Sequence, residues 1–243
     1  MDFTIEKIPK IISIEGNIGA GKTTFVKELK KIYKNRNDVV FLTEPVDIWQ
    51  KVKDNENKNI LERFYEDNKK YAFSFQIMAY VTRLNLLTKT ISENPDCKLI
   101  ITERSLDADK NVFAKMLYDD NCIDDINYNI YLQFYDSYKK KYNTDGIIFI
   151  NADSFICHER VTKRDRTGEH SLSLEYLQRC DEYHVKWLYS QYRVLNINAS
   201  LNATYNTDHE DDPGLEWLKM ASQFINSTLE TIPDLNTKTA RLI

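Results

Sequence analysis

One nine-residue segment, GNIGAGKTT at residues 16–24, restricts the possible folds more than any other part of this chain. It follows the apolar run KIISIE and precedes a stretch of helical periodicity at residues 23–33. Its spacing fits the pattern G-x-x-x-x-G-K-[ST]. Backbone N–H groups of such a loop surround phosphate oxygens, and the following helix adds the positive end of its dipole. The segment predicts a loop that binds the phosphates of a nucleoside triphosphate, through Gly16, Asn17, Ile18, Gly19, Ala20, Gly21, Lys22, Thr23 and Thr24.

Five short apolar runs predict buried strands at residues 10–15, 39–44, 98–103, 146–150 and, more weakly, somewhere within 194–206. Longer amphipathic stretches with helical periodicity separate them, for example at residues 23–33 and 71–91. Strands that alternate with helices indicate a parallel sheet covered on both faces. No linker rich in Pro, Gly or Ser interrupts the pattern, which predicts one α/β domain. The fifth run is too polar for a central strand.

The composition excludes several classes of protein. The net charge is −4, and basic and acidic residues are mixed along the chain, so a non-specific nucleic-acid binder is not expected. The four cysteines form no CxxC pair and the four histidines show no metal-ligand spacing, which argues against a zinc site or a disulfide framework. The apolar runs are too short to span a bilayer. The first ten residues contain acids and no apolar core of a signal peptide, so we expect a cytosolic protein.

Charged residues follow the second and third expected strands. Glu44 precedes Pro45 at the end of one strand, and Glu103 and Arg104 end the other. Because ligands of an open α/β sheet bind at the carboxyl ends of its strands, these residues should lie near the phosphate-binding loop. A carboxylate there could hold an acceptor hydroxyl for phosphoryl transfer. Two simpler interpretations stay open here: Glu44 as a cap on a turn, and Glu103 as a Mg²⁺ partner only.

Three arginines gather beyond the fourth expected strand, in the segment RVTKRDRTGE at residues 160–169. Such a run of charges is usually a solvated surface. Arg160 and Arg164, however, are four residues apart and share one face of a helix, and Arg166 follows in its exit loop. A lid that closes over phosphates, at about residues 160–171, would use this arrangement.

In their order and spacing, six motifs resemble those of the deoxyribonucleoside kinases, the family of deoxycytidine, deoxyguanosine and mitochondrial thymidine kinases. They are IEGNIGAGKTT (14–24), EPVDIW (44–49), FSFQ (73–76), ERSLDADKNVF (103–113), RVTKRDRTGE (160–169) and LEYLQRCDEYHVKWL (174–188). The resemblance implies a P-loop kinase fold for residues 1–243, with a parallel five-stranded sheet, flanking helices and an arginine lid. It also implies transfer of the ATP γ-phosphoryl to a deoxynucleoside 5′-hydroxyl with Mg²⁺.

The resemblance also implies roles for individual residues. Glu44 would be the general base, with Arg104 beside it, and Lys22, Arg164 and Arg166 would complete the catalytic set. Tyr65 and Glu169 would hold the sugar 3′-hydroxyl, whereas Thr23 and Glu103 would lie on the side of the metal ion. The substrate-binding set is Glu44, Val46, Trp49, Tyr65, Phe75, Gln76, Arg83, Arg104, Asp109, Phe113 and Glu169, and Arg160 and Arg164 would bind the donor. The chain departs from many relatives at Tyr71, where they carry Trp, and matches their donor-base loop only loosely at residues 206–212.

The accepted base depends on three of these residues. Gln76 and Arg83 are seven apart on one expected helix, and Asp109 resembles the family position that meets this arginine in kinases of deoxycytidine and purine deoxynucleosides. The Gln76 amide can pair with the adjacent acceptor and amino donor of cytosine or adenine. A buried Arg–Asp pair leaves no apolar space for the methyl group of thymine. We therefore expect thymidine to be disfavoured; the simpler alternative is an Arg83–Asp109 bridge on the surface.

The resemblance further implies a homodimer, formed by helices near residues 71–92 and 127–142, and feedback inhibition by a deoxynucleoside triphosphate. Two other functions stay open. A nucleoside monophosphate kinase shares the phosphate-binding loop and the lid, but it needs basic groups for the acceptor phosphate. A catalytically silent structural subunit with a kinase fold should have lost Lys22, Glu44 or the lid, and all are present.

Overall fold

A computed structural model describes residues 8–230 apart from 165, 167, 170, 171 and 210. It contains a five-stranded sheet in the order β2-β3-β1-β4-β5, and every neighbouring pair of strands is parallel. The strands are β1 (Lys10–Glu15), β2 (Val39–Leu42), β3 (Leu99–Glu103), β4 (Gly146–Asn151) and β5 (Val194–Asn198). The predicted α/β fold with a parallel five-stranded sheet is confirmed.

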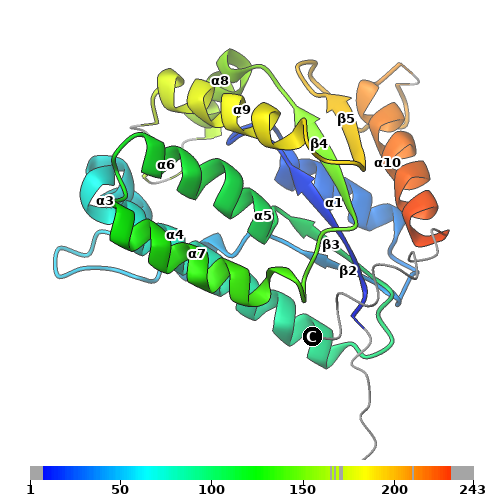
Figure 1. Cartoon of the computed structure of the whole chain (residues 1–243). Coiled ribbons are helices and arrows are strands. Elements are labelled where there is room, and N and C mark those ends of the chain that lie inside the picture. The colour runs from blue at the N-terminus through cyan, green and yellow to red at the C-terminus, as the bar shows by residue number, and fades with distance from the viewer. Residues whose placement is uncertain (1–7, 165, 167, 170–171, 210, 231–243) are drawn as a thin grey trace, which may run out of the picture.

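Helices cover both faces of this sheet (Figure 1). They are α1 (Lys22–Ile32), α2 (Val46–Trp49), α3 (Ile60–Glu66), α4 (Asn68–Glu93), α5 (Leu106–Ala108), the π-helix η1 (Asp109–Ala114), α6 (Lys115–Asp119), α7 (Asp125–Lys139), α8 (Ser154–Arg164), α9 (Leu174–Leu188) and α10 (Pro213–Glu230). In Figure 1, α4 to α7 lie on one side of the sheet, and α1 and α10 lie on the other. None of the helices described is long and apolar enough to cross a membrane.

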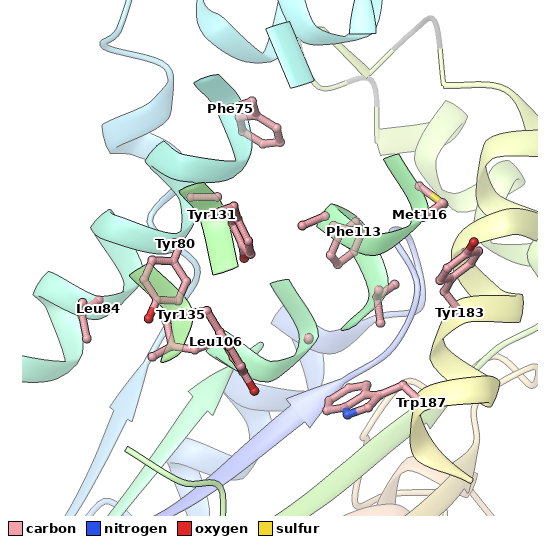
Figure 2. Packing of buried hydrophobic residues seen from close by; sticks show 14 of the residues in the cluster. Phe75, Tyr80, Leu84, Leu106, Phe113, Met116, Tyr131, Tyr135, Tyr183 and Trp187 are labelled. Carbon is pink, nitrogen blue, oxygen red and sulfur yellow. The ribbon is translucent and has the colours of Figure 1, made fainter. Parts of the chain in front are cut away.

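The strands divide their side chains between two buried clusters, as period-two alternation requires. Ile11, Ile100 and Ile147 face a cluster with α4 to α7 and part of α9, while Ile12, Ile101 and Ile148 face α1, α8 and α10. Figure 2 shows part of the first cluster: Tyr80 and Leu84 of α4 and Tyr131 and Tyr135 of α7 lie among the helices, and Trp187 of α9 lies beside a strand. Each face of the sheet thus has its own core.

Two expected strands differ from the observed ones in extent. The second ends at Leu42 and not at residue 44, because the chain turns at Thr43 and Glu44 into the short helix α2. The fifth covers Val194–Asn198, pairs only with β4 and forms the edge of the sheet among the strands described. An edge strand has one solvated side, which explains how a polar segment can join a parallel sheet.

Candidate active site

A cavity of about 710 Å³ opens at the carboxyl ends of the strands. The segment at residues 18–24 lines one end of it, and α2, α3, α4 and η1 line the other. Of the residues predicted from the sequence, those that line the cavity are Ile18, Gly19, Ala20, Gly21, Lys22, Thr23, Thr24, Glu44, Val46, Trp49, Tyr65, Phe75, Gln76, Arg83, Glu103, Arg104, Asp109, Phe113, Arg160, Arg164, Arg166 and Glu169. Gly16 and Asn17, also predicted to bind the donor, are not among the residues that line it.

The loop between β1 and α1 is held closely against the rest of the molecule. Gly16 and Gly19 have φ angles of 146° and 85°, in the region that favours glycine. A Cβ at Gly19 would lie 2.4 Å from the Cys157 carbonyl oxygen, and one at Gly16 would lie 2.5 Å from that of Ile150. Asn17 donates from Nδ2 to the Leu177 carbonyl (2.8 Å) and accepts from the Ile18 N–H (2.8 Å), so it anchors the loop to α9. Only glycine fits where the loop meets β4 and α8.

Lys22 points back over this loop. Its Nζ donates to the carbonyl oxygens of Gly16 (3.0 Å) and Asn17 (2.7 Å), and the residue is only 5% exposed. Burial lowers the pKa of the Lys22 ammonium to about 8, and nearby Arg104 acts in the same direction. A buried cation bonded to neutral carbonyls would gain from an anion, which phosphate oxygens can supply.

Thr23 and Glu103 meet beside the loop, where the Thr23 hydroxyl donates to Glu103 Oε1 at 2.6 Å. A hydroxyl and a carboxylate are hard oxygen ligands, and Mg²⁺ is usually bound by one or two carboxylates together with phosphate oxygens and waters. These two side chains therefore fit a Mg²⁺ ion that accompanies a bound triphosphate. Within the described part of the chain, no group of three or more His, Cys, Asp or Glu residues is placed to hold a metal ion without such help.

A network of charged side chains forms the inner wall at the acceptor end. Glu44 Oε1 accepts from Arg83 Nη2 (3.2 Å) and from Arg104 Nε (3.1 Å). Arg83 also binds both oxygens of Asp109, at 2.9 and 3.3 Å, and the carbonyl of Glu103 at 2.9 Å. Burial alone would raise the pKa of Glu44, but Arg104, Arg83 and Lys22 outweigh it and lower this pKa to about 2. The Arg83 and Asp109 side chains are 6% and 3% exposed, which rules out a surface bridge.

Arg104 occupies an unusual position at the end of β3. Its φ of 66° lies in the left-handed region, which costs a residue with a side chain about 1–3 kcal/mol. The guanidinium carbon lies 4.4 Å from the centre of the Phe113 ring, and Nη1 lies 3.5 Å from His184 Nε2. Strain of this kind persists only where the surroundings over-determine the conformation. Here Glu44, Phe113 and His184 contact the guanidinium from different directions.

Aromatic side chains form the outer wall of the acceptor end. Trp49 meets Phe75 edge to face (centroids 5.4 Å apart, 88° between the rings), and Phe64 packs against the same Phe75 at 4.8 Å. Gln76, which follows Phe75 in α4, is 2% exposed and lines the cavity. Phe113 and Phe75 both line the cavity but come from different helices, η1 and α4 (Figure 2). Stacking surfaces beside a polar amide suit a planar heterocycle.

The lid arginines bind parts of the protein in this structure. Arg160 donates from Nη1 to the carbonyl oxygens of Ala20 (3.3 Å) and Ala199 (3.1 Å). Arg164 forms an ion pair with Glu169 Oε2, and Arg166 donates to its Oε1 at 3.3 Å. Glu169 and Tyr65 both line the cavity, and burial together with the charge of Glu169 raises the pKa of Tyr65. Of the expected lid, residues 165, 167, 170 and 171 lie outside those described.

The sequence analysis missed some residues of the site. Tyr176 lines the cavity and meets Tyr65 edge to face at 6.4 Å, and His184 contacts Arg104 from two turns further along α9. Both lie in the quoted motif LEYLQRCDEYHVKWL, and their eight-residue spacing, two turns of a helix, was the available signal. At the donor end, the lining residues include Leu201, Asn202, Ala203, Tyr205 and Trp217. The described residues among 206–212 do not line the cavity; the Asp212 carboxylate instead accepts from the backbone N–H of Thr204 (2.7 Å) and Tyr205 (3.2 Å).

Known proteins share this arrangement of motifs. A family model described as deoxynucleoside kinase matches residues 12–215. A probable deoxycytidine kinase of fowlpox virus is 34% identical over 182 residues, which cover 74% of this chain and 72% of that protein. Human deoxycytidine kinase is 30% identical over 208 residues, 78% of each chain. Mitochondrial deoxyguanosine kinase of Xenopus laevis is 29% identical over 197 residues, 74% of this chain and 73% of that one. The region matched by the family model includes every site residue predicted from the sequence.

Proposed function

This chain belongs to the deoxynucleoside kinase family, and we propose that it phosphorylates deoxycytidine and the purine deoxynucleosides in preference to thymidine. It is an ATP-dependent deoxynucleoside kinase. The observation that carries the finer proposal is the buried Arg83–Asp109 pair beside Gln76, together with the half-buried Glu44 that Arg83 also binds. In this proposal, these fixed charges and the amide would face the base and the 5′-carbon of a bound nucleoside.

In this proposal, Glu44 orients the 5′-hydroxyl and takes its proton as the phosphoryl group moves. A pKa of about 2 makes Glu44 a weak base before the reaction begins. That suits a loose transition state, in which the attacking hydroxyl forms little bond to phosphorus until late. Arg104 and Arg83 keep the carboxylate ionised and aimed. Lys22 and the lid arginines Arg160, Arg164 and Arg166 would bind the charge that develops on the phosphoryl oxygens.

Thr23 and Glu103 would hold Mg²⁺ with the triphosphate. Held by these two side chains, the ion would neutralise part of the charge of the phosphate groups. The contact between the two side chains supports this role, since both oxygens already lie beside the loop. The sugar would bind between Tyr65 and Glu169. Glu169 would then exchange part of its pairing with Arg164 and Arg166 for the 3′-hydroxyl.

The preference against thymine follows from the environment of Asp109. The Arg83–Asp109 pair is bidentate and buried, so a methyl group placed against it would lose its hydrophobic gain, about 1 kcal/mol, and disturb the charges. Gln76 can satisfy the adjacent acceptor and amino donor of cytosine or adenine. The relatives named above as deoxycytidine and deoxyguanosine kinases support this choice of bases.

The proposal includes a homodimer. The helix α7 carries four large apolar side chains at intervals of four residues, exposed by 38% to 75%: Ile126, Ile130, Phe134 and Tyr138. It contacts α4 through the hydrogen bond from the Tyr80 hydroxyl to the Phe134 carbonyl (3.2 Å). A stripe of this kind is an interaction surface more often than a solvated one. Light scattering at micromolar concentration should give twice the chain mass, and a monomer mass would contradict the dimer.

The proposal also places the chain in the cytosol, as a single kinase domain, and makes it subject to feedback inhibition. One cavity connects the phosphate loop with the acceptor wall. A deoxynucleoside triphosphate could therefore occupy the loop with its phosphates while its base enters the acceptor end. Such an inhibitor should compete with both the donor and the acceptor.

The deciding experiment is a screen with ATP labelled at the γ-phosphate, Mg²⁺ and each of the four common deoxynucleosides. Labelled monophosphates should form fastest with deoxycytidine or a purine deoxynucleoside and slowest with thymidine. The four deoxynucleoside monophosphates serve as competing acceptors; faster labelling of these would identify a monophosphate kinase. If none of the acceptors is labelled, the proposal is wrong.

A further inference from the structure

His184 lies four residues before the end of α9 and is completely buried. Its Nδ1 is 2.7 Å from the carbonyl oxygen of Cys180. A carbonyl oxygen only accepts hydrogen bonds, so Nδ1 must carry the proton. Burial, and secondarily the charge of Arg104, lowers the pKa of His184 well below its usual value. The ring is therefore neutral, and its Nε2 carries a free lone pair.

That lone pair faces Arg104. Nη1 of the guanidinium lies 3.5 Å from Nε2, at the long end of the range for a hydrogen bond, and only the guanidinium can donate. The imidazole is fixed by its neighbours, since it stacks on Phe149 (5.9 Å, 23°) and meets Phe113 edge to face (5.9 Å, 86°). Phe113 in turn presents its ring to the guanidinium at 4.4 Å. His184 and Phe113 thus contact the same guanidinium from two sides.

The other end of this guanidinium holds Glu44. Nε donates to Glu44 Oε1 at 3.1 Å, and the left-handed backbone of Arg104 sets the direction from which the side chain starts. A planar guanidinium turns as one unit. If Nη1 loses its acceptor, the Nε–H that aims Glu44 turns with it. The orientation of Glu44 is therefore linked to His184 through one rigid group.

We propose that His184 is a positioning residue for phosphoryl transfer: as the neutral Nδ1–H tautomer it accepts a hydrogen bond from Arg104 and so aims the guanidinium that holds Glu44. This inference rests on the proposed role of Glu44. It assigns no contact between His184 and the substrate, because the ring lies behind Arg104 and does not line the cavity. Its loss should therefore act on the chemical step and leave nucleoside affinity almost unchanged.

The test compares His184→Leu with His184→Gln. Leucine fills similar space without an acceptor, and we expect kcat to fall about tenfold while KM for the nucleoside changes by less than about twofold. The glutamine amide oxygen can reach the place of Nε2, so His184→Gln should recover most of kcat. Leu188→Ala is the control for packing, since it shortens a buried side chain one turn further along α9. It should lower the melting temperature but keep kcat.

A second measurement does not depend on activity. Long-range ¹H–¹⁵N NMR of the wild-type protein should show His184 protonated at Nδ1 alone across about pH 5 to 8. An Nε2–H tautomer or a titrating ring would overturn the inference. So would unchanged kcat in His184→Leu, or equal losses in the Leu and Gln variants. If the wild-type protein labels none of the nucleosides, the proposed function fails instead, and the NMR result still decides the tautomer.

Discussion

The two ends of the cavity are built in different ways. The phosphate loop of the donor end is one continuous segment, residues 16–24, in which the backbone carbonyls of Gly16 and Asn17 hold the Lys22 ammonium. The acceptor end is an assembly of side chains: Glu44 follows β2, Arg83 comes from α4, Arg104 follows β3, and Asp109 begins η1. The donor end therefore depends on chain conformation at its glycines. The acceptor end depends on the pairing of charges.

Their electrostatics differ as well. Lys22 at the donor end is a buried cation bonded to neutral carbonyl oxygens, and its pKa is lowered to about 8. Glu44 at the acceptor end is an anion held by two guanidiniums, and its pKa is lowered to about 2. The first site is prepared for an incoming anion. The second already has its counter-charges and is prepared to orient a neutral hydroxyl.

The largest effect should come from the carboxylate of the acceptor end. Glu44→Gln keeps the shape of the side chain but removes the base, so kcat should fall by about 10²-fold or more while the fold and ATP binding persist. Steady-state kinetics with ATP titration would measure this. Glu56→Gln, at an exposed ion pair with Arg63, is the matched control and should behave as wild type. A rise in KM at constant kcat would mean that Glu44 only binds the nucleoside.

The next largest effect should come from the lid arginines, and it tests whether they act on the phosphoryl group of the donor. Arg164→Ala removes a charge that we place on the moving phosphoryl group, so kcat should fall by about 10²-fold, with a smaller change in KM for ATP. Arg166→Ala should act in the same sense. Arg179→Ala, which removes a surface arginine paired with Asp120 and Glu182, is the control. If Arg164→Ala changes only KM for the nucleoside, its pairing with Glu169 is its main role.

A smaller effect concerns the base. The double change Arg83→Met with Asp109→Ala removes both partners of the buried pair and opens apolar space for a methyl group. Relative kcat/KM for thymidine over deoxycytidine should rise by at least about tenfold, or about 1.4 kcal/mol, even though overall activity falls because Glu44 loses a partner. Arg63→Met with Asp54→Ala removes a surface pair as the control. An unchanged ranking of nucleosides, or a wild-type preference for thymidine, would refute the assignment.

The last test concerns the pH dependence of stability. The folded-state pKa of Glu44 lies at about 2, below the ordinary value of 4.5. The unfolded chain therefore binds the proton first, so the stabilisation from this carboxylate is complete above about pH 4.5 and is lost as the pH falls toward 2. Urea unfolding of wild type and Glu44→Gln should give free energies that converge across this window. Curves that stay parallel would show that the network does not hold Glu44 ionised.

Much of the fold followed from local pattern. The phosphate loop, four of the strands and the helix after the loop were predicted within a few residues, because each depends on consecutive residues and on the period of burial. The polarity of the fifth run excluded a central position, and β5 is an edge strand; the early end of β2 was not predicted, since it depends on where the chain turns toward α2. Residues 206–212 matched the family's donor-base loop only loosely, and the residues that line the donor end of the cavity come before this segment.

The site residues, too, were predicted from the sequence only in part. The resemblance and the strand ends named Glu44, Arg83, Arg104 and Asp109, but nothing in their order along the chain showed that Arg83 binds Glu44 as well as Asp109. His184 was missed because a single histidine in an amphipathic helix looks like an ordinary buried residue. Nothing in the sequence showed that the Asn17 side chain binds the Leu177 carbonyl and so anchors the loop to α9.

The sequence by itself determined the phosphate loop, since a turn of glycines followed by a helix is a property of neighbouring residues and their backbone angles. Only the tertiary structure decided the charge network. Glu44 is 39 residues from Arg83 and 60 from Arg104, Arg83 is 26 from Asp109, and Arg104 is 80 from His184. Interactions between charges depend on separation in space and on burial, and both arise only when the strands pair and the helices cover the sheet.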